Sequence, residues 1–182
     1  MTDYDAVSRL KKGDLSGLEE LVVRYQNKAL RVVYLIVQDE PLAEDIVVDT
    51  FLRVADRITS FDARQPFEPY LMRSLVHAAL NATRSQRSAP DGAADADRLE
   101  KLLSSAPSPE ELVESSELRA EIQRALVSLS PRQRAVIIQR YYLQMSEREM
   151  AQAADAPTGT IKWLLHQARQ TLASLLNKQR IE

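Results

Sequence analysis

Cysteine is absent from the 182-residue chain, which has only four glycines and two histidines. The lack of cysteine excludes a disulfide framework, a thiol nucleophile and a cysteine-based zinc site. With only His77 and His166, a histidine-rich metal site is excluded as well. Four glycines leave few sites for tight turns, so the composition favours helices over hairpins.

Long apolar runs are also missing. None approaches the roughly 18 residues of a membrane span, and the N-terminus, MTDYDAVSRL, lacks the apolar core of a signal peptide. We therefore expect a cytoplasmic protein with no membrane insertion. The sequence has no glycine-rich phosphate loop, metal-ligand spacing or nucleophile motif, so we expect neither an enzyme nor a bound cofactor or metal.

Charge is unevenly distributed, although the formal net charge is only −2. Residues 1–90 have 12 basic and 13 acidic side chains, and residues 91–116 have 2 basic and 7 acidic ones. Residues 117–182 have 10 basic and 6 acidic side chains, a net charge of +4. A basic C-terminal part fits a surface that faces phosphate, although a solvated basic face would have the same composition.

Two helix starts in the C-terminal part can be recognised from their capping motifs. Ser130 supplies an N-cap hydroxyl, Pro131 occupies the first helical position, and Gln133 completes a capping box. Ser146 and Glu149 form a second capping box with the same spacing of three. Each motif predicts that a helix begins at the following residue.

The second of these starts predicts a helix-turn-helix. A short helix should span 147–154, and Pro157 should force a break because the residue before a proline avoids the helical region. A longer helix should span 158–176, with apolar residues at spacings of three and four. In a helix-turn-helix the second helix enters the DNA major groove. A helical hairpin with no DNA role would have the same pattern.

The N-terminal part is a series of amphipathic helices by its hydrophobic spacing. We expect helices over 3–12, 15–37, 42–58 and 70–87, a turn over 38–41 and an aromatic loop over 59–69. In the third helix we expect Leu52 to point inward with the other apolar residues. The last helix has no acidic residue, so with the aromatic loop it could follow a nucleic-acid strand through stacking and phosphate contacts. An ordinary surface helix is the alternative.

A composition change divides the chain in two. Proline, alanine, serine, aspartate and glycine dominate 89–109, where the apolar spacing stops, so we interpret this segment as a linker. We therefore expect an all-α protein of two small helical domains, residues 1–88 and residues 110–182, joined by a flexible linker.

Two stretches resemble one known family. Residues 43–81, AEDIVVDTFLRVADRITSFDARQPFEPYLMRSLVHAALN, resemble region 2 of bacterial extracytoplasmic-function (ECF, group IV) sigma factors of the sigma-70 family. Residues 129–169, LSPRQRAVIIQRYYLQMSEREMAQAADAPTGTIKWLLHQAR, resemble their region 4. The resemblance implies a transcription initiation factor that binds core RNA polymerase, directs it to −35 and −10 promoter elements and melts DNA at −10. It also implies an anti-sigma factor as a partner.

The resemblance further implies roles for individual residues. The core-polymerase surface would comprise Asp45, Asp49, Thr50 and Arg53. The −10 reader would comprise Phe61, Arg64, Phe67, Tyr70, Arg73, His77 and Arg84, with the aromatic rings shaping a pocket for a flipped base. The −35 reader would comprise Ser146, Thr158, Thr160, Lys162, Trp163, His166 and Arg169.

Each of these surfaces has a simpler alternative. Asp45 and Asp49 could form a solvated face, and Phe61 and Phe67 could be ordinary core residues. Trp163 could contact a neighbouring helix or an anti-sigma factor instead of DNA.

The chain departs from the family pattern at several positions. Val48 replaces a usual glutamine, Ala55 a tryptophan and Asp155 the glycine of the turn, and Trp163-Leu164-Leu165 replaces serine-arginine-leucine. Each lost phosphate contact flattens the salt dependence of DNA binding by about 0.9. Two hypotheses follow: a sigma factor that relies on polymerase for most of its binding energy, or a sigma-like decoy that binds an anti-sigma factor without reading promoters.

Overall fold

The structure is a computed structural model and describes residues 2–85 and 124–179. The elements in these two ranges are helical, with no strand among them, which confirms the all-α prediction. They are α1 (Asp3–Lys11), α2 (Ser16–Val37), α3 (Glu40–Asp56), the 3₁₀-helix η1 (Ile58–Ser60), α4 (Phe67–Ser85), α7 (Pro131–Ile137), the π-helical η3 (Ile138–Tyr142), α8 (Glu147–Ala154) and α9 (Thr158–Gln179). The predicted linker, 89–109, lies outside the described residues.

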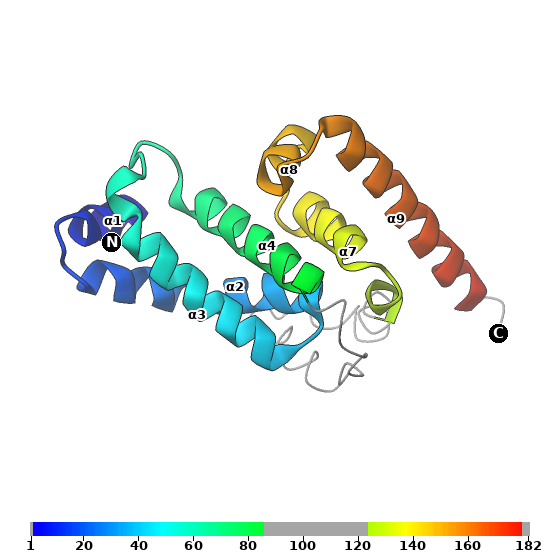
Figure 1. Cartoon of the computed structure of the whole chain (residues 1–182), viewed down its shortest axis with the longest axis horizontal. Coiled ribbons are helices and arrows are strands. Elements are labelled where there is room, and N and C mark those ends of the chain that lie inside the picture. Colours follow the sequence, from blue (N-terminus) through cyan, green and yellow to red (C-terminus); the bar gives the residue numbers. More distant parts are fainter. Residues whose placement is uncertain (1, 86–123, 180–182) are drawn as a thin grey trace, which may run out of the picture.

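Residues 2–85 form what we call the N-terminal bundle. In it α3 and α4 run alongside α2, and α1 lies at the end that holds the N-terminus (Figure 1). Thr2 and Asp5 form a capping box that starts α1, and Gly13 ends the helical path with a φ of 85°. Gln38 adopts the left-handed conformation at the end of α2, so the chain turns there without a glycine.

Two helices of the bundle begin earlier than predicted, and both starts contain a proline. α3 begins at Glu40 because Pro41 sits in the first turn, where its missing N–H costs no helical hydrogen bond. Asp39 caps this turn by accepting from the Leu42 N–H at 3.0 Å. α4 likewise begins at Phe67, so that Pro69 lies in its first turn instead of before it.

Residues 124–179 form what we call the C-terminal motif. The capping boxes at Ser130 and Ser146 are both present, and α7 and α8 begin where they predict. α8 ends at Ala154, and Asp155 takes a left-handed conformation with a φ of 47°. α9 then runs back across α7 and α8, which confirms the predicted helix-turn-helix geometry (Figure 1).

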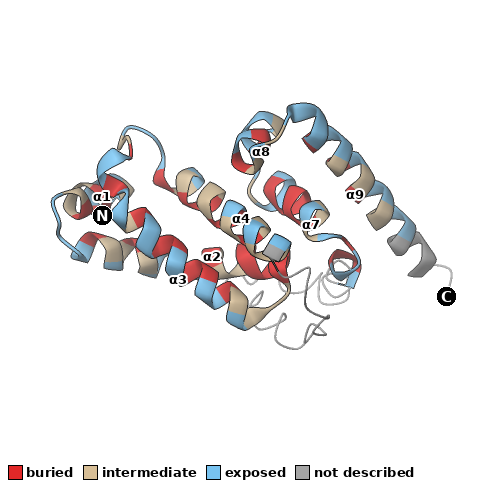
Figure 2. Ribbon diagram, in the orientation of Figure 1, coloured by how far each residue is buried: buried red, intermediate tan, exposed pale blue. Residues whose placement is uncertain are grey.

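The two parts share one hydrophobic core. α7 lies against α2 and α4, and α8 lies against α4. Buried residues line the inner faces of α4 and α7 where they meet, while the outer faces of α3 and α9 are largely exposed (Figure 2). The outer faces of α3 and α9 are therefore where side chains are available to partners.

Candidate functional site

The outward face of α3 has charged and apolar side chains in adjacent rows. Asp45, Asp49 and Arg53 succeed one another at a spacing of four and are exposed, as the predicted surface requires. Val48 and Leu52 are exposed by 57% and 54% and lie one turn apart. The predicted inward position of Leu52 is therefore wrong, because other apolar residues of α3 fill its buried face.

Thr50 does not belong to this face. Its side chain is 2% exposed, and its buried hydroxyl has no hydrogen-bond partner among the described residues. One residue along a helix is a rotation of about 100°, which takes position 50 from the exposed row of Asp49 to the buried side. Thr50 lines the groove between α3 and α4 instead of the outward face, and its part in polymerase binding stays a prediction.

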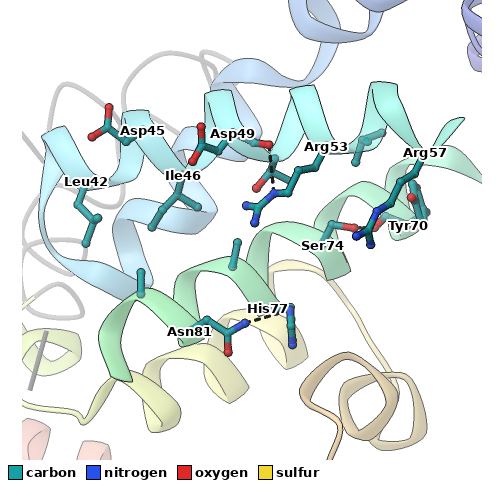
Figure 3. Close-up of a pocket in the computed structure, with 14 residues that line it drawn as sticks. Leu42, Asp45, Ile46, Asp49, Arg53, Arg57, Tyr70, Ser74, His77 and Asn81 are labelled. Carbon is teal, nitrogen blue, oxygen red and sulfur yellow. Dashed lines mark hydrogen bonds between the residues drawn. The ribbon is translucent and has the colours of Figure 1, made fainter. Parts of the chain in front are cut away.

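A groove of about 620 Å³ separates α3 from α4 (Figure 3). Both predicted surfaces meet in it: the α3 side contributes Asp45, Asp49 and Arg53, and the α4 side contributes Tyr70 and His77. Three further polar residues, Arg57, Ser74 and Asn81, line the groove and were not among the predicted residues. The Asn81 amide lies 3.3 Å from Nδ1 of His77, one turn away, so the two side chains support each other (Figure 3).

Four aromatic rings cluster where the loop after η1 meets α4. Phe61 meets Phe67 edge-on at 5.9 Å between centroids and lies 4.7 Å from Tyr70, and Tyr25 lies 6.0 Å from Phe67. Phe67 is only 2% exposed, so its main contribution is to the core. The Tyr25 hydroxyl donates to Asp3 at 2.5 Å, and burial, reinforced by this bond, raises the pKa of Tyr25.

A second hollow, of about 340 Å³, lies on the other side of this loop. Phe61, Arg64 and Phe67 line it together with Tyr4 and Val7 of α1. Phe61 and Phe67 thus belong to the core and also border a pocket, so both alternatives from the sequence describe part of their surroundings. Tyr70 lines the groove against α3 instead, so the structure does not bring all three predicted rings to one pocket.

Arg64 is already engaged within its loop. Its Nε and Nη2 donate to both carboxylate oxygens of Asp62 at 3.0–3.3 Å. This pair and the Arg64 backbone N–H hold the pKa of Asp62 below its usual range. Arg64 must exchange this carboxylate for phosphate if it is to bind DNA.

Arg73 is separated from the other predicted −10 residues. It lines a small hollow of about 100 Å³ between α4 and the C-terminal motif, with Met145 and Glu149 on the opposite side. The pKa of Glu149 is held below its usual range by hydrogen bonds from the side chain and backbone of Ser146, and in smaller part by the charge of Arg73. Arg84 is exposed in the last turn of α4.

The corner of the helix-turn-helix is built by Ser146 and Asp155. The Ser146 Oγ accepts from the Glu149 N–H at 3.3 Å and so caps α8, while the Ser146 N–H and hydroxyl donate to Oε2 of Glu149 at 2.8 and 2.7 Å. The Ala156 N–H donates to the Ala151 carbonyl at 3.0 Å, which closes the turn after α8. A hollow of about 410 Å³ beside this turn is lined by Arg148, which sequence reasoning missed, and by Thr158.

The outward face of α9 presents the remaining predicted −35 residues. Thr158, Thr160, Lys162, Trp163, His166 and Arg169 are all exposed, Trp163 by 60%. The opposite face is buried on α7 and α8. Trp163 therefore does not pack on a neighbouring described helix, which removes one alternative, while its contact with DNA or an anti-sigma factor stays a prediction.

The cations of α9 have weak or neutral partners. Lys162 Nζ lies 3.8 Å from Oε2 of Glu147. Arg169 Nε donates to the Tyr141 hydroxyl at 2.8 Å and stands over its ring. Lys162 lies in the second turn of α9 and Arg169 about two turns further along, and both side chains are exposed.

Neither a membrane-crossing helix nor a metal-binding cluster is found in the described ranges. No helix there has the length and apolar character to cross a membrane. No group of three or more histidine, aspartate or glutamate side chains there could hold a metal ion.

Family models match most of the chain. The model of sigma-70 region 2 matches residues 21–89, and that of sigma-70 region 4 matches residues 119–172. The first match covers α3, the aromatic loop and α4, and the second covers the helix-turn-helix.

Individual proteins match over nearly the whole length. The ECF RNA polymerase sigma-E factor of Escherichia coli K12 is 32% identical over 180 residues, 94% of this chain and 93% of that protein. The structure of CnrH in complex with the cytosolic domain of CnrY aligns with a TM-score of 0.66 at 22% identity, over 97% of both chains. The sigma factor RpoE of Bartonella quintana, in complex with the anti-sigma factor NepR, aligns with a TM-score of 0.60 at 23% identity, over 87% of this chain and 96% of that one.

Proposed function

This chain belongs to the ECF sigma factors of the sigma-70 family, transcription initiation factors that direct core RNA polymerase to promoters, and we propose here how its residues divide that task. We assign polymerase and −10 binding to residues 1–88 and −35 binding to residues 110–182, with 89–109 as the linker. The proposed role needs no bond-making step by the chain itself. Its place of action is the bacterial cytoplasm, where RNA polymerase works.

The outward face of α9 supports the −35 assignment most directly. Lys162, Trp163 and His166 are exposed in the first half of the second helix of a helix-turn-helix, the part of that motif that meets base edges. Thr158 and Thr160 at its start and Arg169 further along are suited to phosphate contacts. Ser146 contributes indirectly, because its hydroxyl caps α8.

The exposed side of α3 supports the polymerase assignment. Asp45, Asp49 and Arg53 supply charge, and Val48 with Leu52 supplies an exposed apolar surface of the kind found at the centre of protein interfaces. Val48 replaces the usual glutamine, so we propose that this contact is more apolar in this chain than in the family pattern.

The groove between α3 and α4 and the loop pocket support the −10 assignment. Tyr70 and His77 line the groove, while Phe61 and Arg64 line the pocket. Stacking on rings and contacts to phosphate offset the few kcal/mol that extrusion of a base costs. Promoter melting at −10 is part of this proposal.

An anti-sigma factor is the proposed second partner. The aligned RpoE structure contains such a factor, but it does not favour the decoy hypothesis, because a working sigma factor also binds one. Both DNA-facing segments keep basic side chains, which a decoy would not need.

Run-off transcription tests the proposal. The purified chain with core polymerase should produce transcripts from the DNA upstream of its own gene.

Lys162→Ala and His166→Ala should weaken −35 use and leave core binding unchanged, whereas Leu52→Glu should weaken core binding. Gln26→Ala, at an exposed position of α2 outside these surfaces, is the matched control. A chain that binds core but transcribes from no genomic fragment would contradict the sigma assignment, and recovery of an anti-sigma factor without polymerase from cells would favour a decoy.

A further inference from the structure

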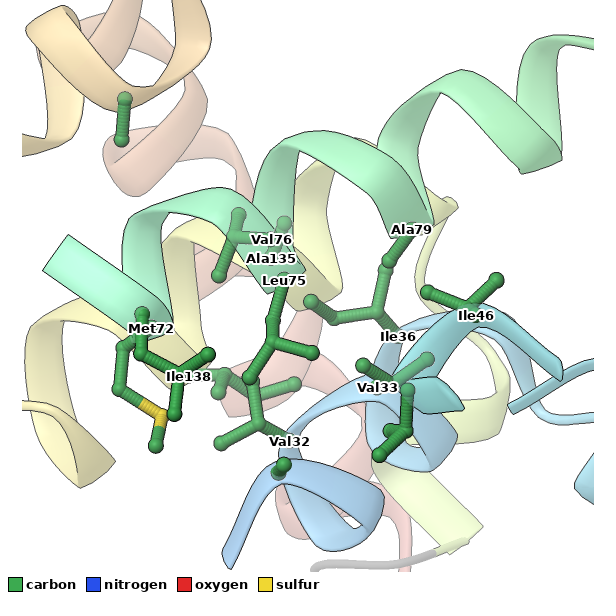
Figure 4. Packing of buried hydrophobic residues seen from close by; sticks show 14 of the residues in the cluster. Val32, Val33, Ile36, Ile46, Met72, Leu75, Val76, Ala79, Ala135 and Ile138 are labelled. Atoms are coloured by element: carbon green, nitrogen blue, oxygen red, sulfur yellow. The ribbon is translucent and has the colours of Figure 1, made fainter. Parts of the chain in front are cut away.

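The C-terminal motif covers an apolar face of the N-terminal bundle. Ala135 of α7 and Ile138 of η3 are 1% and 3% exposed and face α2 and α4 (Figure 4). They belong to one cluster with Val32 and Ile36 of α2 and with Met72, Leu75, Val76 and Ala79 of α4 (Figure 4). Separation of the two parts would expose this face to water, so burial favours their contact.

A buried arginine joins the two parts at the centre of this contact. Arg134 of α7 donates from Nε to the Ile36 carbonyl of α2 at 2.8 Å and from Nη1 to the Leu129 carbonyl at 2.9 Å. Ile36 lies in the last turn of α2, where carbonyls lack helical partners and carry partial negative charge. Burial lowers the pKa of Arg134 to about 10, so the side chain is still charged at neutral pH.

Polar contacts surround the apolar centre. Arg31 of α2 donates from Nη1 to the Tyr142 hydroxyl at 3.2 Å, and Lys28 Nζ lies 5.9 Å from the centre of the Tyr142 ring. On the α4 side, Arg73 shares a hollow with Glu149. A cation that we assign to −10 DNA is thus opposite a carboxylate of the helix-turn-helix.

We propose that the chain, when free of polymerase, is held closed by its own C-terminal motif, with Arg134 as the latch and Arg73 covered by Glu149. The closed form leaves the outward face of α9 available and withholds one contact from the −10 strand. The role given to Arg73 rests on the proposed function, whereas the closed state does not. Opening requires that the Ile36 carbonyl and the apolar face of α2 and α4 find other partners.

The absence of cysteine makes a distance measurement simple. Val23→Cys on α2 and Gln170→Cys on α9 place two dyes at exposed positions outside the contact. Single-molecule energy transfer on the full chain, without polymerase or DNA, should show a dominant narrow high-transfer population, with at most about a tenth of the molecules at low transfer. A broad low-transfer distribution would overturn the proposal.

Paired variants test the latch. Arg134→Ala should add a low-transfer population, and Arg132→Ala, exposed two residues away on the same helix, should not. Tyr142→Ala should open the chain more mildly, while its neighbour Tyr141→Ala, whose partner Arg169 lies within the C-terminal motif, should leave it closed. Far-ultraviolet circular dichroism checks that helix content is kept. If Arg134→Ala folds and both it and Tyr142→Ala keep the wild-type transfer, the latch is wrong.

Binding of a fluorescent single-stranded DNA oligonucleotide tests the consequence. If roughly a tenth of the wild-type chain is open, opening variants should bind up to about tenfold more tightly. Arg73→Ala should remove this gain. If energy transfer shows a closed chain but the chain never supports transcription, only the proposed function is contradicted. If energy transfer shows an open chain that does support transcription, only the closed state is contradicted. Unchanged DNA affinity in a variant that opens would overturn the covering of Arg73.

Discussion

The N-terminal bundle and the C-terminal motif hold their cations differently. In the bundle, four cations pair with carboxylates: Arg9 with Glu20, Arg24 with Asp3 and Glu20, Lys28 with Glu68, and Arg64 with Asp62. In the described part of the motif, the carboxylate pair is the looser one between Lys162 and Glu147 at 3.8 Å. In the motif, Arg134, Arg140 and Arg169 donate to carbonyl or phenol oxygens, which neutralise no charge. Residues 2–85 have 11 basic and 13 acidic side chains and residues 124–179 have 8 and 3, so the net positive charge of the described residues lies in the motif.

This difference in charge suggests that the two parts contribute differently to DNA binding. Duplex DNA attracts unneutralised cations through its phosphates, so the motif should provide most of the salt-dependent affinity. The bundle, in which acidic side chains outnumber basic ones and several cations are paired, should depend more on ring stacking and on polymerase contacts.

The largest expected effect is on the free energy of unfolding. It arises because a glycine of the bundle is closely packed, whereas a glycine of the motif is not. At Gly17 of α2 a Cβ would lie 2.8 Å from the Leu10 N and still closer to the Ala6 carbonyl oxygen of α1, so both obstacles are backbone. Gly17→Ala should reduce the free energy of unfolding by about 1–3 kcal/mol. At Gly159 of α9 nothing lies within 4 Å, and Gly159→Ala should increase it by up to about 0.5–1 kcal/mol. Urea denaturation of the full chain measures the free energy of unfolding of both variants. Equal changes in the two variants would contradict the predicted difference in packing.

The next effect concerns duplex DNA. Lys162→Ala and Arg169→Ala should each lower the salt-dependence slope of binding to a mixed-sequence duplex by about 0.9, because each removes one cation that faces phosphate. Lys12→Ala in the bundle, an exposed lysine outside the proposed surfaces, should leave the slope nearly unchanged. Fluorescence anisotropy over a salt series measures the slopes. A similar loss in all three variants would mean that charge acts diffusely over the whole chain.

A smaller effect on DNA binding should appear when a cation of the bundle loses its carboxylate partner. Asp62→Asn removes the carboxylate that holds Arg64, which should then reach a single strand and raise the slope for single-stranded DNA by up to about 0.7. Asp56→Asn, which removes an exposed charge at the end of α3, is the matched control. If both variants gain equally, net charge and not Arg64 is responsible.

Local signals in the sequence were sufficient for much of the fold. The capping boxes at Ser130 and Ser146 and the proline at 157 predicted α7, α8 and the turn, because caps act within one helical turn. The exposed row on α9 also followed from helical spacing. The starts of α3 and α4 were misplaced because a proline was taken as a break where it occupies a first turn.

Features that depend on contacts between distant segments were not predictable. Thr50 and Leu52 exchange their expected sides because several faces of α3 are apolar in sequence, and only packing decides which is buried. Arg134 gives no sequence signal of burial, since its carbonyl partner is 98 residues away. The position of Arg73 opposite Glu149 likewise arises only when the two parts meet.

The smallest expected effect compares two left-handed residues that end helices in the two parts. Asp155 ends α8 with a φ of 47°, and Gln38 ends α2 with a φ of 60°. Replacement by glycine relieves the clash of Cβ in this conformation, so Asp155→Gly should stabilise the chain by up to about 1 kcal/mol. Gln38→Gly should gain less, because the Gln38 side chain donates to the Leu35 carbonyl at 2.9 Å and that bond is lost. Thermal unfolding of both variants measures the difference. An equal gain would mean that the Gln38 bond contributes nothing, and a loss at Asp155 would mean that its carboxylate, rather than its backbone conformation, explains why it occupies the turn.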